Sequence, residues 1–355
     1  MRRPACLVAA FLGVVVLALL ATHEWDPRFF ATRGPQWERH DPGFRKQADG
    51  TIFFEFAADP RAAAERFPRF RTTRIFYPLT ARVLALGRAE LVAWTLVLIN
   101  FAAIVLGTEV VHRLLEGRGL PSWPALAYGG WGGLGLALLH DTSEPLAYLC
   151  VLLGIALQER GCTVSAGAAF LGALLTRETT VLFVAPYLLL GRRAGEAPPW
   201  RMAGAVFGAW GAWLAGVAIL GVGSTAPDLP PVLPLAGYRA TRALDLPATI
   251  LYLVAPSMVV IALALPGLRR RPTDASLWAV VLNALLVLWL PLKTAELLWH
   301  SGRIATGLVG AILLATPLAL STPRVWRALA VLFASSASWT VAVTARYLLW
   351  DVRSW

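Results

Sequence analysis

The chain has 355 residues, of which 57% are hydrophobic and only 15% are charged. A soluble domain usually carries about a quarter charged residues, so this composition excludes a disordered chain, a coiled coil and an ordinary soluble enzyme. The formal net charge is +11, but no nucleic-acid-binding signature accompanies it. We therefore assign the excess arginines to loops that flank membrane spans, and expect no nucleic-acid partner. The three cysteines lack CxxC spacing, which argues against a zinc site and a disulfide framework.

The apolar residues fall into about eleven blocks, each near the length that crosses a bilayer as a helix. The sequence therefore predicts an all-α fold, a polytopic transmembrane helical bundle of about eleven spans. The first block lies in residues 1–22, and we interpret it as an uncleaved first transmembrane helix because no clear cleavage site follows. The other expected spans are 91–111, 124–139, 145–158, 163–176, 179–191, 202–222, 247–266, 275–292, 304–320 and 328–345.

Basic residues divide the connections into two sets. Arg2 and Arg3 precede the first span and favour a cytoplasmic N-terminus. Arginine-rich connections then recur at every second loop, at 112–118, 159–160, 192–201, 269–271 and 324–327. The alternate connections would face outward, and so would the long hydrophilic segment 23–90. This gives four parts: the first helix 1–22, an extracytoplasmic loop 23–90, a multi-span bundle 91–345 and a short tail 346–355.

The first loop mixes arginines with aromatic residues, a composition that suits helices lying in the lipid headgroup layer. Phe53, Phe54 and Phe56 are expected to form a lipid-facing aromatic surface. Arg71 and Arg74 are candidate ligands of an anionic substrate, since guanidinium groups bind phosphate with two parallel hydrogen bonds. The alternative is a solvated loop held to lipid phosphates by its arginines.

Two short outer connections carry further candidates. Asp141 and Glu144 precede an apolar run, and Arg177 and Glu178 separate two expected spans. Asp141 and Glu144 also fit a helix-capping arrangement, and Glu178 suits a first helical turn. Arg177 is different, because the helix dipole opposes a cation at a helix start. It needs an anionic partner, for which Glu144, Glu178 or a phosphate would serve.

The last outer connection contains Lys293 and Arg303 together with a tryptophan. Both cations are candidate substrate contacts, and the alternative is an interfacial anchor of the kind that tryptophan provides. Two asparagines inside apolar blocks, Asn100 and Asn283, are expected to make interhelical hydrogen bonds.

Four short motifs follow one another in the first loop: Asp49-Gly50, Phe53-Phe54, Asp59-Pro60 and Arg74-Ile-Phe-Tyr-Pro-Leu79. In this order they resemble the long first loop of bacterial GT-C-type polytopic membrane glycosyltransferases and related cell-surface glycan formation proteins. That loop carries an essential acidic residue, then an arginine-rich stretch and an aromatic-Pro-Leu helix. The resemblance extends to 141–145 and 176–179 and covers the N-terminal half of the chain well.

The resemblance implies a GT-C-like fold and sugar transfer from a polyprenyl-phosphate-linked donor to a surface glycan or glycolipid acceptor. It places the reaction at the outer face of a bacterial cytoplasmic membrane. Asp49 would be the general base, and Arg177 and Arg303 would stabilise the leaving phosphate. No cofactor is required by the spacing. A divalent cation held by Asp141 and Glu144 would serve the same end as the arginines.

Two non-enzymatic alternatives remain open. A transporter or flippase of a lipid-linked glycan would need a continuous polar path through the bundle. A glycolipid-binding protein would bind the same lipids without turnover. Convergence of Asp49, Arg177 and Arg303 around one outer cavity would favour the enzyme, and Asp49 pointing away into water would favour neither enzyme nor transporter.

Overall fold

The computed structural model describes residues 4–32, 49–67, 72–191, 200–220 and 233–353, and within these ranges every regular element is a helix. The all-α prediction is therefore confirmed for the described part of the chain. Five helical segments are long and apolar enough to cross a membrane. They are α1 (Pro4–Thr22), α8 (Ala89–Gly117), α14 (Trp200–Ile219), the run α15 (Leu246–Thr249), η4 (Ile250–Val254) and α16 (Ala255–Arg270), and the pair α22 (Pro323–Ser335) and α23 (Ala337–Arg353).

The remaining apolar blocks form shorter helices close to the expected positions. At 1.5 Å per residue a helix of 14 residues, such as α17, is about 21 Å long, less than the ~30 Å hydrocarbon core. The figure of about eleven spans therefore stays a prediction. These helices are α9 (Ala125–Gly129), α10 (Gly132–Leu139), α11 (Glu144–Glu159), α12 (Thr163–Thr176), η2 (Glu178–Thr180), α13 (Val181–Leu190), α17 (Ala275–Leu288), α20 (Thr306–Leu314) and α21 (Thr316–Ser321).

Several expected spans are interrupted rather than continuous. Gly130 and Trp131 separate α9 from α10, and Pro317 lies in the first turn of α21, just after the break that ends α20. Ser336 separates α22 from α23, and its hydroxyl accepts a hydrogen bond from the backbone N–H of Gly132 at 2.8 Å. The last helix continues to Arg353, so the tail expected from residue 346 begins as helix.

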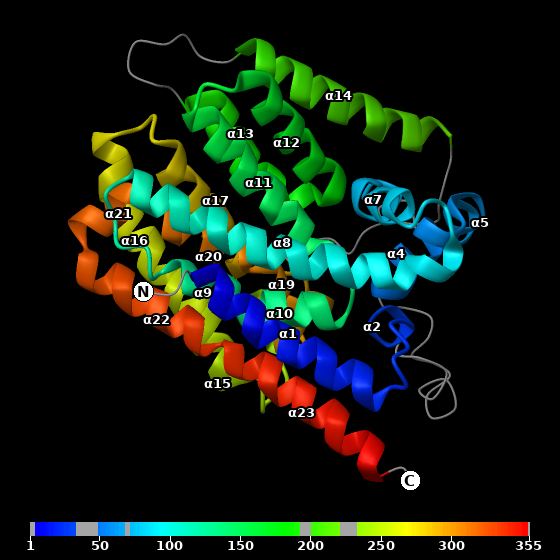
Figure 1. The fold of residues 1–355 in the computed structure, drawn as a ribbon. Coiled ribbons are helices and arrows are strands. Elements are labelled where there is room, and N and C mark those ends of the chain that lie inside the picture. The colour runs from blue at the N-terminus through cyan, green and yellow to red at the C-terminus, as the bar shows by residue number, and fades with distance from the viewer. Residues whose placement is uncertain (1–3, 33–48, 68–71, 192–199, 221–232, 354–355) are drawn as a thin grey trace.

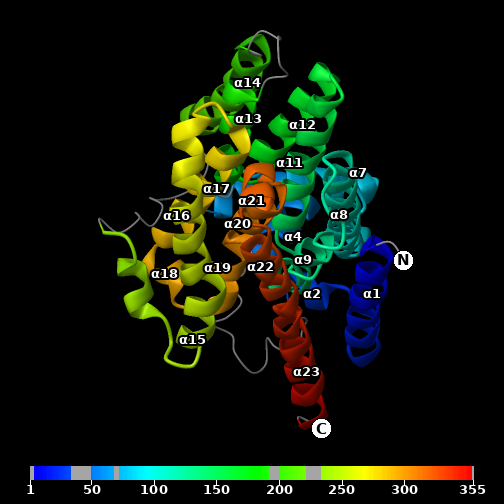
Figure 2. The ribbon, with the colours of Figure 1, turned by 90° about the vertical axis from the view of Figure 1, so that its left-hand side faces the viewer.

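The centre of the bundle is formed by α10 and α20, in which every residue is buried. Around them α11 packs against α8 and α12, and α13 and α20 pack against α17. Helix α14 lies at the edge of the bundle in both views, packed against α12 and α13 (Figures 1 and 2). It is the least buried of the five long segments, as expected for a helix that faces lipid.

The first loop folds into α2 (Arg28–Thr32), α4 (Asp49–Ala58), α5 (Pro60–Arg66) and α7 (Phe76–Leu84). Helices α4, α5 and α7 gather at the end of the bundle where α8 begins (Figure 1). Arg82 of α7 donates to the carbonyls of Ala57 and Ala58, at 2.9 and 2.8 Å, and so ties α7 to the end of α4. The short helices η3 (Ala236–Ala240), α18 (Leu292–Ala295) and α19 (Leu298–Ile304) complete the described elements.

The prediction that Phe53 and Phe56 face lipid is wrong. Phe53 is buried edge-on against Tyr77, with ring centroids 5.3 Å apart, and Phe56 packs against Phe67. The apolar surface that α7 exposes consists instead of Leu79, Val83 and Leu84. An aromatic-rich segment therefore packs against protein here, and the neighbouring helix presents aliphatic side chains outward.

Candidate functional site

Asp49 is the first residue of α4, and the following glycine sets its position. A Cβ atom at Gly50 would lie 2.3 Å from the carbonyl oxygen of His140 and 3.0 Å from that of Ala31. Only glycine therefore lets the start of α4 approach the turn between α10 and α11 this closely. The approach brings Asp49 Oδ2 to 3.6 Å from Nη2 of Arg303, with 15% of the Asp49 side chain exposed.

Arg303 lies in the last turn of α19, which a tight contact with α10 holds in place. The indole Nε1–H of Trp131 donates to the carbonyl of Gly302 at 3.0 Å, and Gly133 packs directly on that residue. Arg303 Nε lies 3.9 Å from Glu144 Oε1, too far for a hydrogen bond. Its buried Nε has no hydrogen-bond partner. Arg303 is thus held between two carboxylates by charge, with hydrogen-bonding capacity left over.

Glu144 is the first residue of α11 and is completely buried. Its Oε1 lies 2.9 Å from Nη1 of Arg177, whose side chain is 6% exposed. Burial alone would raise the pKa of Glu144, but the guanidinium groups of Arg177 and Arg303 outweigh burial and hold this pKa below its usual range. Arg177 also donates from Nε to the hydroxyl of Thr179 at 3.2 Å. The expected anionic partner of Arg177 is therefore Glu144.

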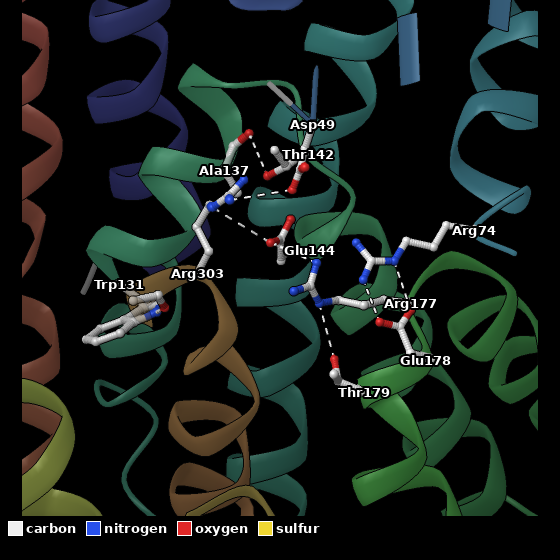
Figure 3. A network of polar contacts seen from close by, with 11 residues as sticks. Asp49, Arg74, Trp131, Ala137, Thr142, Glu144, Arg177, Glu178, Thr179 and Arg303 are labelled. Atoms are coloured by element: carbon white, nitrogen blue, oxygen red, sulfur yellow. Dashed lines mark hydrogen bonds and ion pairs between the residues drawn. The ribbon is translucent and has the colours of Figure 1, made fainter. Parts of the chain in front are cut away.

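Arg74 and Glu178 form a second ion pair beside the first (Figure 3). Nε and Nη2 of Arg74 donate to the two oxygens of Glu178, at 2.8 and 2.5 Å. The pair joins the segment before α7 to the turn that links α12 and α13. Because Glu178 follows Arg177 directly, the pair also connects the first loop to the Arg177–Glu144 contact.

The structure thus brings together predicted site residues from five separate parts of the chain (Figure 3). We call this group the ion-pair cluster. It consists of three guanidinium and three carboxylate groups: Arg74, Arg177, Arg303, Asp49, Glu144 and Glu178. Its full charges cancel, so an added phosphate would compete with the carboxylates for the guanidinium groups.

Asp141 is also completely buried, but its contacts differ from those of the ion-pair cluster. Its backbone has a φ of +44°, a conformation that aspartate and asparagine tolerate better than most residues. Its Oδ1 lies 3.5 Å from Nδ2 of Asn100, which also donates to the hydroxyl of Tyr77 at 2.7 Å. Burial raises the pKa of Asp141 well above its ordinary value. The interhelical role expected for Asn100 is confirmed.

The capping alternative for Asp141 and Glu144 is wrong. Ser143 is the N-cap residue of α11 in the structure, and it makes no side-chain capping hydrogen bond.

Of the other predicted residues, Arg71 lies outside the described part of the chain. Lys293 lies in α18, the element before the one that carries Arg303. Trp131 and Thr179 were not predicted as site residues. A tryptophan in an apolar block gives no signal of its long-range contact with Gly302, and nothing distinguishes Thr179 from the other residues of the 176–179 motif.

Within the part of the chain that the structure describes, Asp141 and Glu144 do not fit a divalent cation. Among the described residues, no group of three or more histidine, cysteine or acidic side chains is arranged to hold a metal. Glu144 faces two guanidinium groups, and Asp141 faces an amide.

No protein-family model, curated protein or solved structure matches the chain.

Proposed function

We propose that the chain is an integral membrane glycosyltransferase of the GT-C type. It transfers a sugar from a polyprenyl-phosphate-linked donor to a surface glycan or glycolipid acceptor at the outer face of a bacterial cytoplasmic membrane. The observation that carries the proposal is the position of Asp49, which is partly exposed at the start of α4 and faces Arg303. A carboxylate and a cation are thereby held side by side at the end of a bundle of apolar helices.

The roles follow from the chemistry of transfer. The acceptor hydroxyl loses a proton as it attacks the anomeric carbon, and Asp49 takes that proton as general base. The bond from the anomeric carbon to the phosphate oxygen breaks, and negative charge develops on the departing polyprenyl phosphate. Arg303 and Arg177 stabilise this charge, since both are held close to one buried carboxylate before substrate arrives. Glu144 positions these two guanidinium groups.

Arg74 and Glu178 have a supporting role in the proposal. Their paired hydrogen bonds hold the first loop, which carries Asp49, against the turn that carries Arg177. The arginine-rich connections of the first set fit a cytoplasmic location for the opposite end of the bundle. The ion-pair cluster would then face outward, on the side where lipid-linked sugars are consumed.

Asp49→Asn tests the proposal, and Asp59→Asn is its matched control in the same loop. Asp59 caps α5 by accepting hydrogen bonds from the backbone N–H groups of Arg61 and Ala62, a role that asparagine also fills. Envelope glycans would be compared in a deletion strain that carries the wild-type chain or either variant. Purified protein in lipid nanodiscs would then be supplied with radiolabelled polyprenyl-phosphate sugars.

We expect Asp49→Asn to insert normally and to lower the transfer rate by roughly 10²–10⁴-fold, the usual contribution of a general base. Asp59→Asn should transfer like the wild type. Equal transfer by Asp49→Asn and wild type would reject Asp49 as the base. Binding of lipid-linked sugar without turnover by either protein would favour a glycolipid-binding protein instead.

A further inference from the structure

A layer of uncharged polar side chains lies beneath the ion-pair cluster. Tyr148 follows Glu144 by four residues in α11, and Thr306 follows Arg303 by three. Within α11 this spacing places Glu144 and Tyr148 on the same face, about one turn, or ~5 Å, apart, whereas Arg303 and Thr306 belong to two successive helices, α19 and α20, that meet at Ala305. The third member, Asn283, comes from α17, which packs against α20. We call Tyr148, Asn283 and Thr306 the neutral layer.

Gly307 brings two of these side chains together. A Cβ atom at Gly307 would lie 2.2 Å from Oδ1 of Asn283 and 2.7 Å from the hydroxyl oxygen of Tyr148. Both oxygens therefore lie close to the Cα of Gly307, the residue that follows Thr306. Any larger residue at this position would displace them.

The neutral layer is buried, but its polar atoms lack partners. At most 2% of each residue is exposed, and the two hydroxyl oxygens and the amide oxygen make no hydrogen bond of good geometry, with the Tyr148 hydroxyl lying near the side chain of Thr179 and the backbone of Gly307. The amide nitrogen of Asn283 donates within its own helix, to Ala279 at 2.8 Å, so the interhelical bond expected for this residue is not the one it makes. Three unpartnered polar groups at one level of an apolar bundle are costly, and buried polar groups normally have partners.

We propose that the neutral layer is the subsite for the sugar hydroxyl groups of the lipid-linked donor. This assignment rests on the proposed function and adds to it the part of the site that recognises the sugar. Tyrosine and threonine hydroxyls both donate and accept hydrogen bonds, and the asparagine oxygen accepts them, which matches the hydroxyl groups of a neutral sugar. The phosphate remains at Arg177 and Arg303, beside Glu144, which precedes Tyr148 by about one turn of α11.

Two substitutions remove the hydroxyls with little change of shape: Tyr148→Phe and Thr306→Val. If the hydroxyls serve only the fold, removing an unpartnered buried group leaves the stability unchanged or raises it, and nothing else changes. If they bind sugar, the stability behaves in the same way, but recognition of the sugar is lost. Thr108→Val is the matched control, because Thr108 is also fully buried and its hydroxyl already bonds to Ile104.

The probes are a polyprenyl phosphate without sugar and the same lipid carrying glucose, galactose, mannose or arabinose. Binding to each would be measured with full-length protein in nanodiscs. We expect the wild type and Thr108→Val to bind one glycosylated lipid at least ~10-fold more tightly than the sugar-free lipid. Tyr148→Phe and Thr306→Val should reduce that ratio to within about 3-fold of one, with unchanged affinity for the sugar-free lipid.

The outcomes separate the two proposals. If the wild type prefers a glycosylated lipid and both variants keep that preference, the subsite assignment is wrong and the proposed function stands. If the wild type binds glycosylated and sugar-free lipids equally, the neutral layer does not recognise sugar. If it binds no polyprenyl phosphate of either kind, the proposed function fails and the subsite fails with it.

Discussion

Glu144→Gln is the sharpest perturbation of the ion-pair cluster, because it removes one charge and almost no volume. Glu144 Oε1 lies 2.9 Å from Arg177 and 3.9 Å from Arg303. At an effective dielectric constant of 20, these separations correspond to gross attractions of about 6 and about 4 kcal/mol. Desolvation offsets most of this, and breaking a buried pair typically costs about 3–5 kcal/mol, since a buried charge is left behind. We expect Glu144→Gln to lower the free energy of unfolding by about that much.

Thermal unfolding in detergent, followed by tryptophan fluorescence, would measure the loss. The exposed pair of Glu90 with Arg88 supplies the control, since solvent screens it and Glu90→Gln should leave the melting temperature essentially unchanged. A double variant that also carries Arg177→Gln removes both charges and should recover part of the loss. A Glu144→Gln protein as stable as wild type, or a double variant whose loss equals the sum of the two single losses, would refute the reasoning.

The same pair fixes the sign of a pH effect. The pKa of Glu144 is lowered in the folded protein, so its charge stabilises the fold above the ordinary value of 4.5. This contribution is complete at neutral pH and is lost as the pH falls through the lowered pKa. The difference in stability between wild type and Glu144→Gln should therefore shrink in acid. A difference that stays constant from pH 7 to pH 3 would contradict the assigned ion pairs.

Three further predictions test other parts of the site. Gly50→Ala should displace α4, cost about 1–3 kcal/mol of stability and reduce the transfer rate more than tenfold. Gly204→Ala is the control, because its added Cβ would lie in open space on α14. If both variants behave alike in thermal unfolding and transfer assays, the close approach at Gly50 is rejected. Asp141 has a raised pKa, so its burial costs stability increasingly as the pH rises above its ordinary value of 3.8; Asp141→Asn should stabilise the protein at pH 7 but not at pH 3.5, and a loss at both pH values would count against this. Arg74→Lys should lower stability by about 1–2 kcal/mol, because lysine cannot reproduce the two parallel hydrogen bonds to Glu178; an unchanged melting temperature would show that the pair contributes nothing.

The helical fold follows from the sequence because long apolar blocks can satisfy their backbone hydrogen bonds in a membrane only within helices or closed barrels. Some expected limits agree with the structure, as for α12, which runs from Thr163 to Thr176 as predicted. Others do not, since α8 runs from Ala89 to Gly117 where 91–111 was expected. The interruptions were not predicted. Hydropathy shows that residues 124–139 are apolar. It does not show that the backbone N–H of Gly132 donates to the hydroxyl of Ser336, or that a new helix begins at Gly132.

Burial of the first loop escaped prediction for a similar reason. A phenylalanine is equally suited to lipid and to protein, so Phe53 gives no sequence signal that distinguishes the two. The structure places its ring against Tyr77, more than twenty positions away, and only tertiary contacts specify such a pairing. Arg177 was more informative, since the helix dipole opposes a cation at a helix start and such a cation needs an anionic partner. The sequence therefore predicts Glu144, Glu178 or a phosphate as the partner of Arg177.

The choice between those alternatives depends on position. Glu178 is adjacent to Arg177, but it pairs with Arg74, a residue 104 positions earlier. Arg177 lies in extended backbone at the end of α12, which directs its side chain away from its neighbour and toward the start of α11. The residues of the ion-pair cluster can thus be predicted from the sequence. Which carboxylate pairs with which arginine depends on tertiary contacts that the sequence pattern does not show.

A purely structural role explains the ion-pair cluster poorly. Replacing a buried ion pair with apolar residues is often neutral or stabilising, so a bundle as apolar as this one does not need buried ion pairs for its stability. The geometry points the same way, because Arg303 is held at 3.6 and 3.9 Å from two carboxylates and its buried Nε has no hydrogen-bond partner. An arginine selected for stability alone would close these distances and use its planar group fully, as Arg74 does with Glu178. The unused capacity of Arg303 lies beside the partly exposed Asp49, which is the arrangement that binding an anionic ligand next to a base requires.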